Sequence, residues 1–97
     1  MIVALSSARI RRDLRSGFEE AALAMVAGSR AEAGCVSYAF AADLGDPDVV
    51  LCVEVWLDDD ALETHMAAEH TQRFLAAAPS LTDGDPQMQL YRVAAQD

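Results

Sequence analysis

The sequence predicts an α+β fold of the ferredoxin-like type, with the element order β-α-β-β-α-β and an antiparallel sheet. Three observations predict this fold. Segments with strand-like patterns alternate along the chain with segments of helical periodicity. A dense turn signal at residues 43–48 lies between two strand-like segments, which favours a hairpin. The chain has 97 residues, so we expect one domain that spans residues 1–97.

The first third of the chain predicts one strand and one helix. Residues 2–8 favour a strand. Apolar side chains then recur at three- and four-residue spacing over residues 17–33, which is typical of an amphipathic helix. Ser16 and Glu19 match a capping box at the start of this helix, and Gly34 stands where helices often end in the left-handed region.

Two strands are expected next. Residues 35–42 alternate in polarity, and this places Val36, Tyr38 and Phe40 on one face of the strand. Residues 49–57 are almost continuously apolar, which is typical of a strand covered on both faces.

The last part of the chain predicts two short helices and a closing strand. Residues 58–60 are all Asp and supply an N-cap and an acidic first turn. We expect a break near residues 69–70 and a second helix that reaches Ala78, where a following proline ends it. Residues 83–86 carry a turn signal, and residues 88–94 form the closing strand.

A ferredoxin-like unit leaves one face of its sheet without helices. In the third strand that face carries Leu51, Val53 and Val55, all apolar. Burying such side chains contributes roughly 1.5–3 kcal/mol each, and a monomer would leave them in water. The sequence therefore predicts a homodimer that packs these faces together.

The charge excludes one class of partner. The formal net charge is −9, from 16 acidic and 7 basic side chains, and nucleic-acid affinity depends mainly on cationic side chains. We therefore expect no nucleic-acid binding. The chain also has no apolar run near the ~20 residues of a membrane span and no signal-peptide pattern, so we expect no membrane partner.

The two cysteines bear on the compartment. Cys35 and Cys52 both lie in apolar runs and are not spaced as CxxC. This pattern suits buried free thiols better than a disulfide framework. The sequence therefore predicts a cytoplasmic protein.

His65 is the most informative ionisable residue. It shares an apolar helical stripe with Leu62 and Met66, so its side chain should face the sheet. Two interpretations follow: a hydrogen-bonded core histidine, or the proton acceptor of a pocket, because imidazole accepts a proton well near neutral pH.

Other candidates lie on the strands and the last helix. Glu54 is either a structural carboxylate tied to Arg92 or to backbone, or a group with a raised pKa beside a pocket. Trp56 is either a core residue with its indole nitrogen bonded to the nearby turn, or a wall of the pocket. Tyr38 and Phe74 likewise belong to the core or to a pocket wall.

The sequence gives no sign of a metal or an organic cofactor. His70 is expected to be exposed or to cap a helix, and it is separated from His65 by an expected helix break. The two histidines therefore make a poor metal pair, and no Cys or Asp completes a zinc set. A glycine-rich loop for flavin or nicotinamide is also lacking.

The chain resembles the antibiotic biosynthesis monooxygenase (ABM) family of dimeric α/β barrels over nearly its whole length. The segments that carry the resemblance are residues 30–35, Tyr38, residues 46–47, residues 54–56, residues 61–62, His65, His70 and Phe74. The resemblance implies a homodimeric barrel with a pocket in each subunit, between the sheet and the helices. Some members of the family oxygenate anthrones or quinols with no cofactor, and others degrade haem.

The haem-degrading members differ from this chain at key positions. They carry an Asn in the first strand and a Trp and a His in the second helical region. This chain has Ser6, Ser7, His65 and Leu75 at about those places. The axial ligand is missing, so haem degradation is not expected. Of the residues that surround the substrate in polyketide-oxidising members, only Trp56 is placed by motif.

The resemblance therefore implies a cofactor-independent monooxygenase that acts on an electron-rich aromatic molecule of the anthrone or quinol type. His65 is the expected base, and the expected substrate-binding residues are Trp56, Tyr38, Phe74, Ser6 and Glu54. Two alternatives stay open. One is a non-catalytic barrel that binds a small molecule, for instance in a stress response, and the other is a cofactor-free isomerase or cyclase.

Overall fold

The computed structural model describes residues 1–94. Within this range, four strands and three α-helices follow one another, with two short 3₁₀ turns. Their order is β1 (Ile2–Ile10), η1 (Arg12–Leu14), α1 (Arg15–Arg30), β2 (Cys35–Asp43), β3 (Asp46–Trp56), α2 (Asp59–Ala67), α3 (Glu69–Ala77), η2 (Ala78–Ser80) and β4 (Thr82–Arg92).

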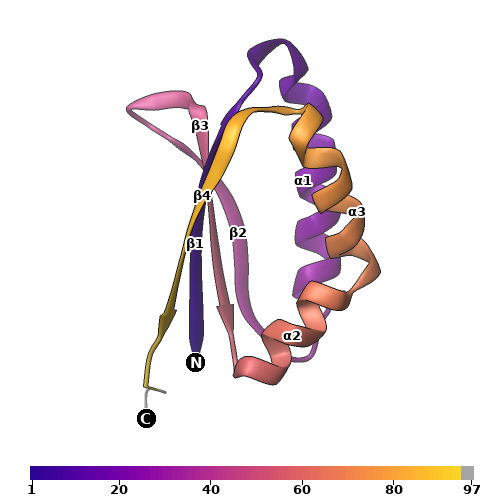
Figure 1. Ribbon diagram of the computed structural model, residues 1–97, viewed down its shortest axis with the longest axis vertical. Coiled ribbons are helices and arrows are strands. Elements are labelled where there is room, and N and C mark those ends of the chain that lie inside the picture. Colours follow the sequence, from indigo (N-terminus) through magenta and orange to yellow (C-terminus); the bar gives the residue numbers. More distant parts are fainter. Residues whose placement is uncertain (95–97) are drawn as a thin grey trace.

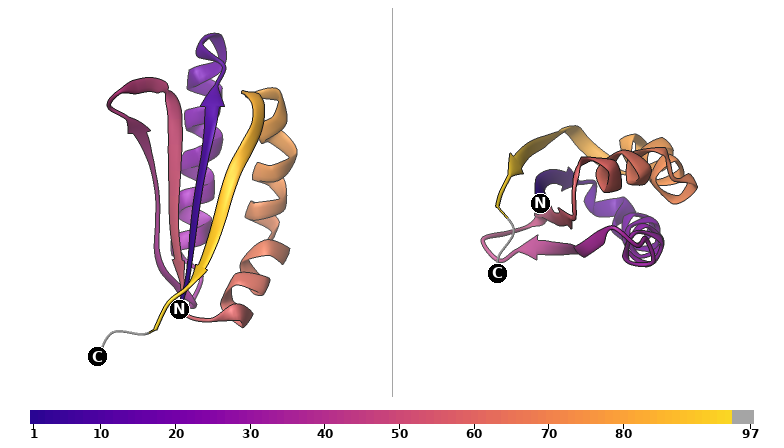
Figure 2. Two further views of the ribbon diagram at one scale, coloured as in Figure 1. Left: turned by 60° about the vertical axis from the view of Figure 1, so that its left-hand side comes forward. Right: turned by 90° about the horizontal axis from the view of Figure 1, so that it is seen from below.

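The strands form one antiparallel sheet in the order β2-β3-β1-β4. The helices all lie on one side of this sheet, and the opposite face is free of helices (Figures 1 and 2). This arrangement confirms the ferredoxin-like α+β fold and the hairpin between β2 and β3. Among the described residues, no helix is long and apolar enough to cross a membrane.

The strand register determines which side chains of neighbouring strands lie together on the face that the helices cover. Tyr38 of β2 pairs with Glu54 of β3, and Glu54 pairs with Ala4 of β1. Two residues further along, Cys52 of β3 pairs with Ser6 of β1. Because side chains alternate between the two faces of a strand, these residues project toward the helices from adjacent strands. The sheet thus presents polar groups in the middle of an otherwise apolar face.

The helices begin and end differently from the prediction. The capping box is wrong, because Leu14 occupies the N-cap position and Ser16 lies inside α1. Glu19 instead accepts a hydrogen bond from the side chain of Arg15. Gly34 does not adopt a positive φ; a Cβ atom at this position would overlap the side chain of Ala61. Gly34 therefore allows the turn after α1 to approach α2 closely.

Two local irregularities also differ from the prediction. The register of β2 against β3 shifts between Cys35 and Ser37, so Val36 is half exposed instead of sharing a face with Tyr38. Residues 83–86 do not form a turn, because β4 already begins at Thr82. They make a bulge in β4, where the register against β1 shifts and Gly84 has a φ of 83°. A bulge places extra residues within a strand and uses the same residue types as a turn, so the sequence pattern of residues 83–86 fits either one.

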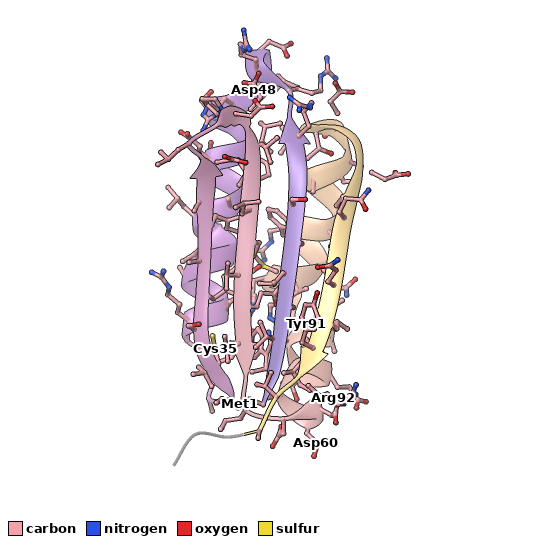
Figure 3. All side chains as sticks on the ribbon, turned by 90° about the vertical axis from the view of Figure 1, so that its left-hand side faces the viewer. Met1, Cys35, Asp48, Asp60, Tyr91 and Arg92 are labelled. Carbon is pink, nitrogen blue, oxygen red and sulfur yellow. The ribbon has the colours of Figure 1, made fainter. Side chains whose placement is uncertain are left out.

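An apolar row runs along the middle of the helix-free face of the sheet, the face that Figure 3 shows with its side chains. Leu51 and Val53 of β3 point to this face and are 38% and 41% exposed. Leu5 of β1 pairs with Val53 and is exposed to the same degree, and Tyr91 of β4 is also exposed. The expectation that this face carries an apolar row is confirmed.

Candidate functional site

A cavity of about 440 Å³ lies between the sheet and the helices. Its lining is mostly apolar, and side chains of Phe and Met supply much of it. One group of polar side chains lies on the part of the wall that β1, β2, β3, α2 and α3 form together. The polar side chains of this group are those of Ser6, Tyr38, Cys52, Glu54, His65 and Thr71. A cavity of this size with few polar groups is typical of a small-molecule site.

Five of the six predicted site residues line this cavity: Ser6, Tyr38, Glu54, His65 and Phe74. Among the residues that the structure describes, Trp56 is not part of the cavity lining, and its side chain is fully buried. The expectation that Trp56 forms a wall of the pocket therefore does not match the structure. Trp56 lies behind the wall, because its position at the end of β3 places it beneath His65.

Trp56 forms a hydrogen bond with Glu54. Its indole N–H donates to Glu54 Oε1 at 2.9 Å, which corrects the expected bond to a turn. Arg92, the expected partner of Glu54, instead pairs with Asp59 on the surface. Burial raises the pKa of Glu54, while the bond from Trp56 acts in the opposite direction. Glu54 is thus a buried carboxyl group at the cavity wall that is held toward its neutral form.

His65 is buried, as predicted, and both of its ring nitrogens lie near carboxyl groups. Its Nδ1 lies 2.7 Å from Glu32 Oε2, and its Nε2 lies 3.6 Å from Glu54 Oε1. An ionised carboxylate only accepts hydrogen bonds, so the short contact assigns the ring proton to Nδ1. His65 Nε2 then keeps its lone pair on the side of Glu54. The Trp56 ring lies against the imidazole, with 4.2 Å between ring centres.

His70 does not have the exposed or capping role that was expected. Its Nε2 lies 2.8 Å from Glu32 Oε2, the same oxygen that His65 contacts. The side chain is 22% exposed, and its ring rests on α1. A Cβ atom at Gly28 would lie 2.5 Å from His70 Cγ. Gly28 therefore makes the room that the imidazole of His70 occupies.

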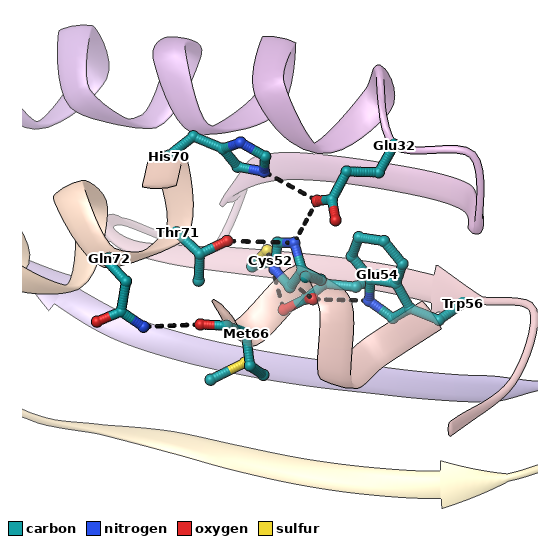
Figure 4. Close-up of polar contacts among 9 residues, drawn as sticks. Glu32, Cys52, Glu54, Trp56, Met66, His70, Thr71 and Gln72 are labelled. Carbon is teal, nitrogen blue, oxygen red and sulfur yellow. Dashed lines mark hydrogen bonds and ion pairs between the residues drawn. The ribbon is translucent and has the colours of Figure 1, made fainter. Parts of the chain in front are cut away.

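Glu32, His65 and His70 form one connected group, which we call the Glu32–His65–His70 cluster (Figure 4). Glu32 comes from the turn after α1, and the histidines come from α2 and α3. The Thr71 hydroxyl lies 3.3 Å from His65 Nδ1. The ligand-type atoms of the cluster all lie within 4.8 Å of one another.

The helix break explains why the two histidines meet. Residues five apart on one continuous helix are turned by about 140° from each other. Ala68 has an extended backbone between α2 and α3, so His70 turns back toward His65. The break itself was predicted from the sequence. The inference that it separates the two histidines was wrong, because both rings contact the same oxygen of Glu32.

The cavity also holds two protonated groups. Burial raises the pKa of Cys52 to about 12. Burial likewise raises the pKa of Tyr38 far above its ordinary value. Both groups therefore stay neutral at physiological pH and present S–H and O–H groups to the cavity. Cys35 and Cys52 are both free thiols.

Comparison with known proteins places the chain in a family. The family profile described as "Antibiotic biosynthesis monooxygenase" matches residues 1–77. This chain belongs to the antibiotic biosynthesis monooxygenase family. A Bacillus subtilis protein named "Putative monooxygenase YcnE" is 30% identical over 81 residues, which cover 84% of this chain and 85% of that protein. An uncharacterised Synechocystis protein, sll1783, is 27% identical over 93 residues, and the chain spans 63% of its length.

Solved structures share the fold of this chain. PA3566 from Pseudomonas aeruginosa is 32% identical, with a TM-score of 0.84, and the match covers 96% of this chain and 94% of that one. A crystal structure of an antibiotic biosynthesis monooxygenase has a TM-score of 0.89 at 23% identity, and the match covers 98% of this chain and 100% of that one. The second match shows the common fold.

Sequence reasoning missed Glu32, which joins the two histidines. Glu32 lies in a polar stretch just before Gly34, and nothing in its spacing points to His65, which is 33 residues away. The one available signal was its place in residues 30–35, a segment that carries the family resemblance. That segment indicated a likeness to the family without indicating which side chain the turn presents.

Proposed function

We propose that this protein is a cofactor-independent monooxygenase that acts on an electron-rich aromatic molecule of the anthrone or quinol type. The observation that carries the proposal is the contact between Glu32 and His65. This contact assigns the proton of His65 to Nδ1 and leaves Nε2 as an acceptor beside the cavity. Membership of the family and the name of the Bacillus relative support monooxygenase chemistry in general terms.

The first step is proton transfer from the substrate to His65 Nε2. The resulting imidazolium keeps its Nδ1–H bond to Glu32, so the carboxylate stabilises the positive charge as it forms. A phenolic or anthrone substrate becomes an anion in this step. The anion is rich enough in electrons to react with oxygen directly, which is why no flavin or metal is required for this chemistry.

The second step consumes oxygen. The substrate anion passes one electron to O₂, and the substrate radical and superoxide then combine. The imidazolium returns its proton, which gives a neutral hydroperoxide. Loss of water from the hydroperoxide breaks the O–O bond and leaves a carbonyl group. One oxygen atom of O₂ is thus found in the product and the other in water, and no external reductant is used.

The cavity supplies the remaining requirements. Its apolar lining excludes water, which strengthens electrostatic interactions with the anion. The hydroxyl groups of Ser6 and Tyr38 and the carboxyl group of Glu54 are the proposed donors to the developing oxyanion. Phe74 is proposed to lie against the aromatic ring of the substrate. The cavity volume of about 440 Å³ lies within the ordinary range for small-molecule pockets.

We also propose that the protein acts as a homodimer in the cytoplasm. The apolar helix-free face supports the dimer, because Leu51 and Val53 stay exposed in the single chain. The two free cysteines support a reducing compartment.

The test of the proposed function is oxygen uptake with a panel of anthrones and quinols. Metal-free protein should consume one O₂ per carbonyl formed from an anthrone methylene group, and ¹⁸O₂ should label the product. Binding of the aromatic compounds without oxygen uptake would instead assign a binding barrel. Turnover that proceeds equally well under nitrogen would assign an isomerase or cyclase.

A further inference from the structure

The Glu32–His65–His70 cluster has the donor atoms of a transition-metal site. It brings together two imidazole nitrogens and one carboxylate, all within 4.8 Å of one another. Two imidazoles and a carboxylate favour zinc and related first-row ions over Mg²⁺ and Ca²⁺, which prefer oxygen ligands. The chain has only two histidines, and the cluster contains both.

The three ligands are held in place before any ion binds. Each comes from a different segment, so the cluster is supported from three sides. The His70 ring occupies the space that Gly28 leaves on α1. His65 packs against the ring of Trp56, with ring centres 4.2 Å apart and ring planes inclined at 32°. The two nitrogen–oxygen contacts measure 2.7 and 2.8 Å. Ligand atoms at about 2.0–2.1 Å from a tetrahedral ion lie roughly 3.3 Å apart, so an ion would widen each contact by about half an ångström.

One oxygen of the cluster has no partner. Glu32 Oε1 is buried, and it has no hydrogen-bond partner among the described residues. A buried carboxylate oxygen without a partner is costly. An ion between the three side chains would offer this oxygen a ligand bond. The unpartnered atom is therefore an observation, independent of the histidines, that points to a ligand.

The far side of His65 also fits metal binding. Metal-bound histidines usually donate their second ring N–H to a carboxylate. Glu54 Oε1 lies 3.6 Å from His65 Nε2. This separation is longer than a hydrogen bond, so the carboxyl group lies beside Nε2 without bonding to it directly. The outer partner that a metal-binding His65 needs is thus already in place.

The cluster can be reached from outside. His70 lines a surface groove of about 330 Å³ between α1 and α3, and its side chain is partly exposed. His65 lines the larger cavity on the other side. An ion therefore has an entry path past His70.

We propose that Glu32, His65 and His70 bind a divalent transition-metal ion of the zinc class. The ion takes the position of the two ring protons, with His65 Nδ1, His70 Nε2 and the Glu32 carboxylate as ligands. Binding forces His65 into the tautomer that carries its proton on Nε2. That nitrogen then cannot accept a proton from a substrate, so the bound ion switches off the proposed base. This last consequence, unlike the binding itself, rests on the proposed function.

The test uses Co²⁺ as a spectroscopic probe on the full chain, without a histidine tag and after removal of metals. We expect one equivalent of Co²⁺ to give visible ligand-field bands and one equivalent of Zn²⁺ to remove them. His70→Ala should weaken Co²⁺ binding by at least about 100-fold, since even outer partners of a metal ligand affect affinity by 10–100-fold. Glu69→Gln is the matched control. This residue precedes His70, is exposed, and should leave binding unchanged.

A second measurement holds even where a variant fails to fold. In protein labelled with ¹⁵N-histidine, Zn²⁺ should shift the ring nitrogens of both histidines together and saturate at one equivalent. Absence of ligand-field bands at millimolar Co²⁺, or unshifted histidine nitrogens, would overturn the site. Neither readout uses a substrate, so failure of the monooxygenase assay has no bearing on them. Where the protein does oxidise a substrate, Zn²⁺ that binds without inhibiting this oxidation would overturn only the proposed switching of His65. The metal site itself would stand.

Discussion

Glu32 Oε2 lies within hydrogen-bonding distance of both His65 Nδ1 and His70 Nε2, at 2.7 and 2.8 Å. The relationship between Glu32 and His65 is the basis of the proposed chemistry. It requires a carboxylate at a fixed place in the fold, because the hydrogen bond to that carboxylate decides which ring nitrogen carries the proton. The turn after α1 supplies that carboxylate because Gly34 lets it lie close to Ala61 of α2.

His65→Ala separates a catalytic role from a structural one. If His65 is the base, the variant should stay folded and lose about 10²–10⁴-fold in oxidation of an anthrone or quinol, the usual effect of losing a general base. If His65 only packs in the core, the variant should lose about 1–3 kcal/mol of stability from lost packing and unpaired partners. Thermal melts run beside oxygen-uptake assays distinguish these results. Unchanged activity per folded molecule would remove His65 from the site.

Trp56→Phe should act through Glu54. The change keeps an aromatic ring but removes the indole N–H that donates to Glu54 Oε1. A buried group left without its partner costs about 1–3 kcal/mol, so the melting temperature should fall. The same change in a Glu54→Leu background should cost less, because the acceptor is already absent. Equal costs in the two backgrounds would show that the hydrogen bond contributes nothing.

The fold followed closely from the sequence, because its signals are local. The alternation of Tyr38 and Phe40 and the Asp58 N-cap each depend on residues a few positions apart. Asp58 Oδ1 does accept from the Ala61 N–H at 2.8 Å. The bulge at Gly84 was missed because a turn and a bulge use the same residue types. Which one forms depends on the pairing with β1, which no local pattern encodes.

The candidate site followed from the sequence only in part. Helical spacing placed His65 toward the sheet, and strand alternation placed Glu54 beside it. Neither signal extends to Glu32 or His70, because their meeting depends on how α1, α2 and α3 pack. The Gly28 and Gly34 contacts that bring these helices together appear only in three dimensions.

Val53→Asp should disrupt the proposed homodimer. Val53 lies in the middle of the apolar helix-free face and is 41% exposed in the single chain. In a dimer the new carboxylate would be buried without a partner, which is strongly unfavourable. Sedimentation velocity at micromolar concentration should show a dimer for the native protein and a monomer or unfolded chain for the variant. A native protein that sediments as a stable monomer would contradict the dimer.

Alkaline pH should destabilise the protein through Cys52. The pKa of this thiol is raised from 9.0 to about 12 in the folded state, chiefly by burial. The folded state therefore keeps its proton where the unfolded state has lost it. The contribution of the protonated Cys52 thiol to the free energy of unfolding is complete below pH 9. It is lost as the pH rises from about 9 to about 12.

Replacement of Cys52 tests this pH dependence. Melting temperatures measured from pH 8 to pH 11 should fall less steeply for Cys52→Ala than for the native protein. Some slope should remain in the variant, because burial also raises the pKa of Tyr38. Parallel curves for the two proteins would contradict the assignment to Cys52.

The most direct test of the central claim is the tautomer of His65 in metal-free protein at neutral pH. With ¹⁵N-histidine labelling, only two residues give ring signals. We predict that His65 carries its proton on Nδ1 and His70 on Nε2. Replacing Glu32 with Ala should remove this preference of His65, whereas Glu69→Gln should leave it unchanged. A His65 ring protonated on Nε2 in the native protein would leave no acceptor for the substrate proton and would contradict the account.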